Sequence, residues 1–270
     1  MTVKTWFVAA VSAACVFALG CGGGESDSRT CETPDGRISF GQYLLLNDSS
    51  ANSDLPAEEQ VTDHHMCSNV ASGTAQRVNT FWEWGWPAGS TVRLRATPRI
   101  VYGFHPWEAA STTSALPVLV SDVGSLTVWA AVTQRVGTSQ RSDFGVVLYL
   151  TTSDQRTGTD PLPVAKQLLV LRNRYGATTE TPTATGIALS GMSWDVIVSD
   201  TEVLYYPHAN AGERADTLEL ELEDFLQDAV TRDAIEPTWF VASVETGARV
   251  FQGTGELALT DYQVHLTAAE

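Results

Sequence analysis

The sequence predicts an all-β domain built from two packed antiparallel sheets, and three observations support this. Segments in which apolar and polar residues alternate dominate the chain, and such alternation is typical of half-buried strands. Clusters of Gly, Pro, Ser, Thr and Asp separate these segments, for instance at 137–141 and 154–163. A single segment has the periodicity of a helix, and many strands with one late helix favour a sandwich of two sheets.

The alternating segments give the expected strands in chain order. Residues 126–136 show the pattern most clearly, because every second side chain from Leu126 to Val132 is apolar and would point to one face. The segment 242–266 is interpreted as two strands separated by a Gly-rich turn. The full set is expected at about residues 37–46, 75–84, 91–99, 126–136, 143–151, 165–174, 194–199, 202–206, 217–222, 238–244 and 255–266.

One amphipathic helix is expected between Leu222 and Val230, where apolar residues fall at positions i, i+3, i+4, i+7 and i+8. Glu223 and Asp224 lie in its first turn, where the helix dipole favours negative charge. Pro237 lies beyond its end.

The N-terminus has the features of an export signal at residues 1–20. Lys4 precedes an apolar run at 6–19 that is short for a membrane span. Cys21, after small residues and before three glycines, resembles the cysteine of a bacterial lipoprotein box, which would become the lipidated N-terminus. The alternative is an ordinary cleaved signal peptide and a secreted protein. Residues 21–36 are rich in Gly, Ser and charge, which favours a flexible tether before one domain at 37–270.

The remaining cysteines are Cys31 and Cys67, since Cys15 lies inside the signal. Disulfides persist in exported proteins, so one bridge between these two residues is expected. The histidines before Cys67 suggest a metal only weakly, because adjacent residues of a strand point to opposite faces. We therefore expect neither a metal nor another cofactor.

The charge balance excludes some partners. The chain has 16 Lys and Arg against 32 Asp and Glu, a net charge of −16 at pH 7. Such an acidic surface argues against nucleic acid and anionic membrane surfaces as ligands, so membrane contact is expected only through the lipid. It is compatible with a neutral ligand such as a polysaccharide. We expect a monomer.

The segment 242–266 also resembles the C-terminal part of family 12 glycoside hydrolases, which are endo-β-1,4-glucanases. Their motif S-x-Q-x-G-T-E-P-F-x-G, laid on 243–253 without gaps, places its Gln at Glu245. Its catalytic acid/base Glu falls on Arg249. The W-x-W and S-W motifs of the family match Trp82 to Trp84 and Ser193-Trp194, so the resemblance covers roughly residues 31–270. It implies a concanavalin-like β-jelly roll with one helix on the convex side.

The resemblance also gives the positions of the other two family acids, and neither position holds an acidic residue. The nucleophile strand Y-E-x-M-I-W-L-x-x-Y-G matches 166–176 and puts Gln167 at the nucleophile. The assisting Asp falls on Val147. Retaining glycosidases need two carboxyl groups, and arginine stays protonated at any working pH. The resemblance therefore implies a catalytically inactive homologue, a pseudoenzyme that keeps a groove for β-glucan.

Two alternatives remain open from the sequence. One is an active glucanase with relocated carboxylates, for which Glu245 is the best candidate, although a salt-bridge role is the plainer interpretation of this residue. The other is a structural or protein-binding scaffold on the same fold.

Three tryptophans are candidates for sugar contact. Trp82 and Trp84 share a parity and would form a row of aromatic faces, with core packing as the alternative. Trp129 stands on the polar side of its strand, which favours a groove position. The family's N-N-x-W-G segment, whose Trp helps to floor the cleft, corresponds to residues 47–51, which contain no Trp.

Overall fold

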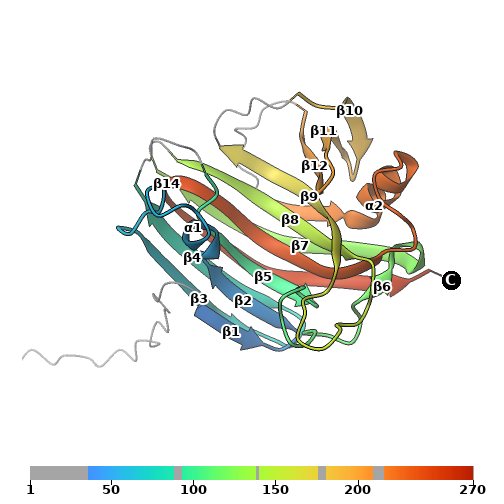
Figure 1. Ribbon diagram of the computed structural model, residues 1–270, viewed down its shortest axis with the longest axis horizontal. Helices are drawn as coiled ribbons and strands as arrows, with labels where there is room; N and C mark the ends of the chain where they lie inside the picture. Colours follow the sequence, from blue (N-terminus) through green and yellow to red (C-terminus); the bar gives the residue numbers. More distant parts are fainter. Residues whose placement is uncertain (1–35, 88–92, 138–139, 176–180, 209–215, 270) are drawn as a thin grey trace, which may run out of the picture.

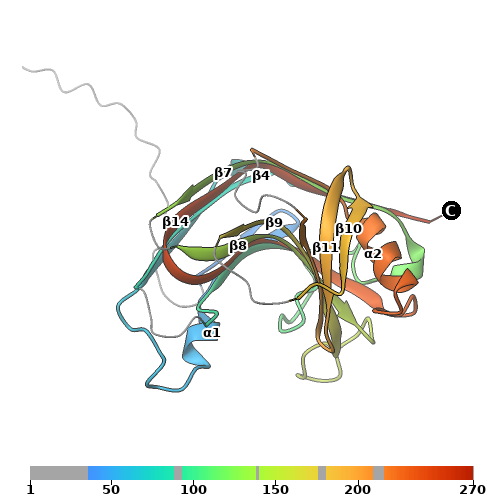
Figure 2. The ribbon, with the colours of Figure 1, turned by 90° about the horizontal axis from the view of Figure 1, so that it is seen from above.

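The computed structural model describes residues 36–87, 93–137, 140–175, 181–208 and 216–269 of the 270-residue chain. It confirms the expected all-β sandwich, in which an inner and an outer sheet lie on each other as curved layers (Figures 1 and 2). The predicted signal peptide, Cys21 and Cys31 lie outside the described residues. No helix among the described residues is long and apolar enough to cross a membrane.

The inner sheet carries the concave face of the molecule. Its strands are antiparallel to their neighbours except for one parallel pair, β9 (Val164–Tyr175) and β12 (Glu202–Pro207). In spatial order they are β1 (Gly36–Phe40), β2 (Tyr43–Asp48), β5 (Thr97–Gly103), β14 (Phe240–Ala268), β8 (Arg141–Thr151), β9 (Val164–Tyr175), β12 (Glu202–Pro207), β11 (Met192–Val198) and β10 (Ala184–Leu189).

The outer sheet covers the opposite side of the core and shares β14 with the inner sheet. Its spatial order is β3 (His65–Gly73), β4 (Val78–Trp86), β14, β7 (Val123–Val136) and β13 (Thr217–Glu221). The smaller elements are β6 (Val118–Leu119), which pairs with the start of β14, the short helices α1 (Ser50–Ser53) and η1 (Val120–Asp122), and the helix α2 (Leu222–Thr231).

The longest strand, β14, belongs to both sheets. Its first half pairs with β5 and β8 of the inner sheet, and its second half pairs with β4 and β7 of the outer sheet. Gly253, at the changeover, has a φ of 86°, a conformation that glycine adopts without the steric cost of a side chain. The segment expected as two strands separated by a turn is therefore one continuous strand, which bends at this Gly-rich stretch and runs back in the opposite direction in the outer sheet (Figure 2).

Other strand predictions also need correction. The segment expected as one strand at 37–46 is the hairpin of β1 and β2, which turns at Gly41 with a φ of 56°. The strand expected at 91–99 begins later, as β5. The strands β3 and β10 were not expected. Both lie at the edge of a sheet, and neither HMCSNVASG of β3 nor ATGIAL of β10 shows a regular alternation of apolar and polar residues.

The helix prediction is confirmed by α2. Its apolar stripe, from Leu222 through Phe225 to Ala229, is buried, and the helix contacts β7. The ring of Phe225 meets the rings of Trp194 and Tyr205 edge-on, with 5.1 Å between centroids in each pair. These contacts bury a large apolar area, and such burial is the main stabilising contribution to a helix of this length.

Candidate functional site

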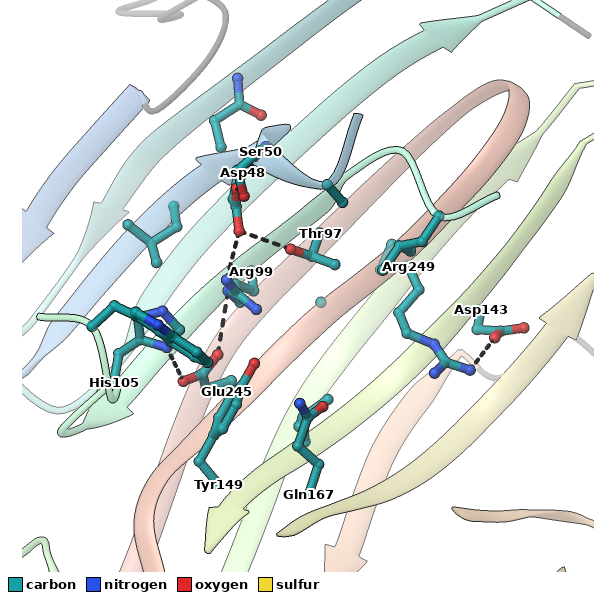
Figure 3. Close-up of a pocket in the computed structure, with 18 of the residues that line it drawn as sticks. Asp48, Ser50, Thr97, Arg99, His105, Asp143, Tyr149, Gln167, Glu245 and Arg249 are labelled. Carbon is teal, nitrogen blue, oxygen red and sulfur yellow. Dashed lines mark hydrogen bonds and ion pairs between the residues drawn. The ribbon is translucent and has the colours of Figure 1, made fainter. Parts of the chain in front are cut away.

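A groove of about 840 Å³ crosses the concave face of the inner sheet (Figure 3). Alternate side chains of each strand point into it, as the two-residue period of a strand requires. On β8, for example, these are Asp143, Gly145, Val147 and Tyr149. The groove is also lined by α1, by the segment that follows β5, and by the strands β1, β2, β5, β14, β9 and β12.

The groove contains all three positions at which the resemblance places a family acid. Gln167 on β9, Val147 on β8 and Arg249 on β14 line it, and Glu245 on β14 lies there too. β8 lies between β9 and β14 in the sheet. Residues that are far apart in the sequence therefore come together at one site.

Arg249 is held by two carboxylates. Its Nη2 donates a hydrogen bond to Asp143 Oδ2 at 2.6 Å (Figure 3), and its Nη1 lies 4.0 Å from Glu202 Oε2. Arg174 adds a second cation, with its Nε 3.7 Å from Asp143 Oδ1. A guanidinium held in this way stays charged and cannot deliver a proton to a leaving group.

Glu245 is 1% exposed and has three partners. Arg99 Nε lies 3.2 Å from its Oε2, His105 Nδ1 lies 2.6 Å from its Oε1, and Ser243 Oγ donates to the same Oε1 at 2.7 Å. Burial by itself would raise the pKa of Glu245, but Arg99 and His105 outweigh it and hold the pKa below the ordinary value of 4.5. The interpretation of Glu245 as a salt-bridge partner is confirmed.

Arg99 continues these contacts to a second carboxylate. Its Nη2 donates to Asp48 Oδ2 at 2.6 Å, and Thr97 Oγ1 donates to the same oxygen at 3.0 Å. Burial would raise the pKa of Asp48, but Arg99 lowers it below the ordinary 3.8. We refer to His105, Glu245, Arg99 and Asp48 as the Glu245 network (Figure 3).

Strand register explains why the Glu245 network forms. Arg99 on β5 is paired with Leu46 on β2 and with Gly247 on β14. Asp48 and Glu245 stand two residues away on these neighbouring strands, so the three charges meet on diagonals of one sheet face. Sequence reasoning missed this, because a diagonal contact requires the order and register of three strands that are distant in the chain.

Three aromatic side chains line the groove next to the Glu245 network: Tyr149, His105 and Trp107. Tyr149 lies edge-on to His105 and to Trp107, with 5.4 and 5.6 Å between ring centroids. Burial raises the pKa of Tyr149 to about 12, so its hydroxyl stays protonated and can donate a hydrogen bond at neutral pH.

The three tryptophans expected to contact sugar do not line the groove. Trp82 and Trp84 on β4 are 0% and 1% exposed in the core between the sheets. Trp129 on β7 is half-buried on the outer sheet, opposite the core-facing residues of that strand, and is therefore on the far side from the groove. These predictions are wrong, because alternation shows which residues share a face but not which sheet that face belongs to.

The tryptophan of the groove is Trp107, which follows β5 and is 57% exposed. Sequence reasoning passed over it because it stands outside any alternating segment. A signal was available in the sequence. A large aromatic residue in a connecting segment is expected at the surface, and connecting segments often carry binding residues.

Cys67 is the member of the predicted cysteine pair that lies within the described residues. Cys67 lies in β3 and is disulfide-bonded, whereas Cys31 lies outside the described residues, so the pairing stays a prediction.

His64 stacks on Trp86 with 3.9 Å between ring centroids. Within the described part of the chain, no group of three or more His, Cys, Asp or Glu side chains is arranged to hold a metal ion.

Comparison with known proteins gives a consistent picture. No protein-family model matches the sequence. Endoglucanase S of Pectobacterium parmentieri is 26% identical over 239 residues, which cover 84% of each chain. A family 12 xyloglucanase of Bacillus licheniformis superposes with a TM-score of 0.74 at 18% identity, over 89% of this chain and all of that one. The family 12 enzyme Cel12A of Humicola grisea, solved with a thio cellotetraose, gives 0.70 at 15% identity, over 88% of this chain and 99% of that one. The chain therefore has the β-jelly roll of family 12 glycoside hydrolases and resembles them in sequence.

Proposed function

We propose that this protein binds a β-glucan-type polysaccharide in the groove and does not hydrolyse it by the retaining mechanism of family 12 glycoside hydrolases. One observation carries the proposal. The groove and its strands are present, but Gln167, Val147 and Arg249 stand where the resemblance places the nucleophile, the assisting acid and the acid/base.

The chemistry of these side chains supports the absence of hydrolysis. Retaining hydrolysis needs two carboxyl groups about 5–5.5 Å apart, one ionised to attack and one protonated to donate. The amide of Gln167 cannot form a glycosyl ester, and Arg249 is held by Asp143. Glu245 cannot replace the acid, because its lowered pKa keeps it ionised beside Arg99.

The groove suits an uncharged polyhydroxy ligand. Several of its charges are paired internally, as in Arg249 with Asp143 and Arg99 with Asp48, which weakens their attraction for an ionic ligand. The paired groups still offer hydrogen-bond donors and acceptors to hydroxyl groups. The Humicola grisea enzyme, with the same fold, was solved with a thio cellotetraose, which supports a glucan as the ligand class.

We expect the purified protein to bind glucan without cleaving it. Native gels that contain xyloglucan, mixed-linkage β-glucan or carboxymethylcellulose should retard the protein, while reducing-sugar assays on the same polymers stay at the level of the buffer. Retardation by none of the three polymers would contradict glucan binding. Release of reducing sugar would contradict the absence of hydrolysis.

One observation favours an alternative, an active glucanase with a relocated nucleophile. Glu202 on β12 is paired with Gln167 on β9 and lines the same groove. If the natural protein does release sugar, Glu202→Gln should abolish the release, whereas activity that survives this change would exclude Glu202 as the nucleophile.

We also propose that Cys21 anchors the protein to a bacterial membrane through a lipid, on the strength of the lipoprotein box. Cys21→Ser should move the protein from the membrane fraction to the soluble fraction of fractionated cells. Cys15→Ser is the matched control, because Cys15 lies in the apolar run of the signal and should leave the distribution unchanged. Equal membrane association of Cys21→Ser and the natural protein would rule out the lipid anchor.

A further inference from the structure

Trp107 is an exposed aromatic side chain at the wall of the groove. It is 57% exposed, the highest value among the large hydrophobic side chains that the structure describes. Exposing an indole forgoes the stabilisation that its burial would provide, and ligand pockets are lined predominantly by apolar and aromatic side chains with a few polar groups. The neighbouring rings of His105 and Tyr149 are almost fully buried and leave Trp107 as the ring that faces solvent.

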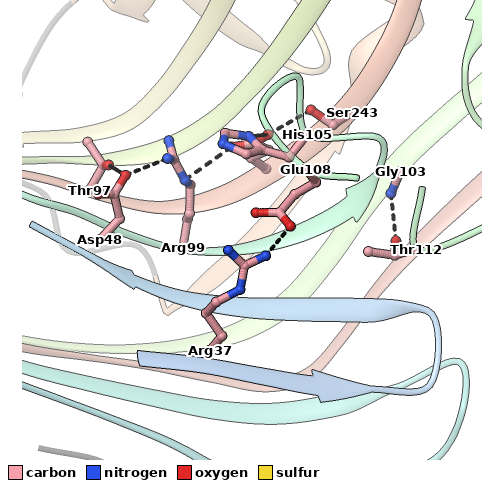
Figure 4. A network of polar contacts seen from close by, with 10 residues as sticks. Arg37, Asp48, Thr97, Arg99, Gly103, His105, Glu108, Thr112 and Ser243 are labelled. Carbon is pink, nitrogen blue, oxygen red and sulfur yellow. Dashed lines mark hydrogen bonds and ion pairs between the residues drawn. The ribbon is translucent and has the colours of Figure 1, made fainter. Parts of the chain in front are cut away.

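The backbone around Trp107 is held by contacts on both sides. The amide of Leu162 donates to the carbonyl of Pro106 at 2.9 Å, and the amide of Glu108 donates to the carbonyl of His105 at 2.9 Å. Arg156 donates to the carbonyl of Glu108, and the Glu108 carboxylate pairs with Arg37 on β1 (Figure 4). A side chain that is positioned before binding loses less conformational freedom when a ligand arrives.

We propose that Trp107 is the stacking platform for one glucosyl unit of the bound chain, and this rests on the proposed function. A β-linked glucose ring carries its hydroxyl groups at the edge and apolar C–H groups on its faces, so an aromatic ring can cover one face. Arg37 and Glu108 also line the groove and offer a hydrogen-bond donor and an acceptor for hydroxyl groups at the ring edge. The Tyr149 hydroxyl is a further donor.

Trp107 lies in the same groove as the segment in which the resemblance would place a tryptophan. Residues 47–51 contain no Trp where the resemblance expects one. Asp48, Ser50 and Ala51 of that segment line the same groove as Trp107. The groove therefore contains an exposed aromatic side chain, which comes from the segment after β5.

The test compares Trp107→Ala and Trp107→Tyr with the natural protein, in titrations with cellohexaose and xyloglucan by calorimetry. Trp107→Ala should bind about tenfold more weakly or worse, the loss expected when a central aromatic contact is removed, and Trp107→Tyr should retain most of the affinity. Trp129→Ala is the matched control, because Trp129 is partly exposed on the opposite sheet and should bind like the natural protein.

Hydroxyl-radical footprinting provides a readout that is independent of the variants. Oxidation of Trp107 in the natural protein should fall when cellohexaose is added, while oxidation of Trp129 stays constant. If the natural protein binds glucan, but Trp107→Ala binds equally well and Trp107 is not protected, the platform is refuted and the proposed function stands. If the natural protein binds no glucan, both are refuted together.

Discussion

Changing Gln167 and Arg249 together to glutamate should produce hydrolysis of xyloglucan or mixed-linkage β-glucan where the natural protein shows none. Gln167→Glu would supply a nucleophile and Arg249→Glu a proton donor, in the groove that already contains both positions. Asp143, now the partner of Arg249, would stand beside the new carboxyl group on β14. Two adjacent carboxyl groups raise the pKa of one of them, which suits the protonated acid that the mechanism needs.

The single variants are the controls for this experiment. Gln167→Glu alone lacks the acid and Arg249→Glu alone lacks the nucleophile, so both should remain at least about 10²-fold below the double variant in reducing-sugar release. Adding Val147→Asp should raise the rate further. A double variant that binds glucan but releases no reducing sugar would show that the two positions are not at catalytic separation. It would weaken the proposal that replacement of the family acids alone abolished hydrolysis.

Glu245→Gln should cause a large loss of stability for a substitution that hardly changes the size of the side chain. Removing one partner of a buried ion pair typically costs about 3–5 kcal/mol. We expect about 3 kcal/mol, because Arg99 keeps Asp48 as a partner. Such a loss is a large share of the roughly 5–15 kcal/mol by which domains are typically stable. Urea unfolding followed by tryptophan fluorescence at pH 7 measures it.

The exposed pair of Arg135 and Glu256 is the matched control. The atoms lie 3.3 Å apart, close to the 3.2 Å of Arg99 and Glu245, but the Arg135 side chain is 72% exposed. Glu256→Gln should therefore change the free energy of unfolding by less than about 1 kcal/mol. Equal losses for Glu245→Gln and Glu256→Gln would contradict the assigned role of the Glu245 network.

The Glu245 network also sets a pH dependence. The pKa values of Glu245 and Asp48 are lower in the folded protein than their ordinary values of 4.5 and 3.8. The stabilisation from each carboxylate is therefore complete above its ordinary pKa and is lost as the pH falls through the lower folded value. The natural protein should lose stability in urea between about pH 5 and pH 3, and Glu245→Gln should lose less over the same interval. A parallel decline would argue against Glu245 as a source of the acid sensitivity.

Much of the fold could be predicted from local pattern. Alternation placed β7, β8 and β9, and the 3.6-residue period placed α2, because these elements pack one clearly apolar face against the core. The replacement of the family acids at Gln167, Val147 and Arg249 was also visible, because a side chain's identity is independent of its neighbours. The edge strands β3 and β10 lacked this pattern and were missed.

Only the tertiary structure decided what the groove contains. Trp129 and Trp107 could not be assigned to a surface from alternation alone, since each side of a strand can face solvent or a groove depending on the sheet it joins. Glu245 became a buried ion-pair partner through Arg99, which comes from a distant strand. The sequence thus determined which chemical groups the chain possesses and which faces are apolar. Their partners depend on strand order and register, which form through contacts between segments far apart in the chain.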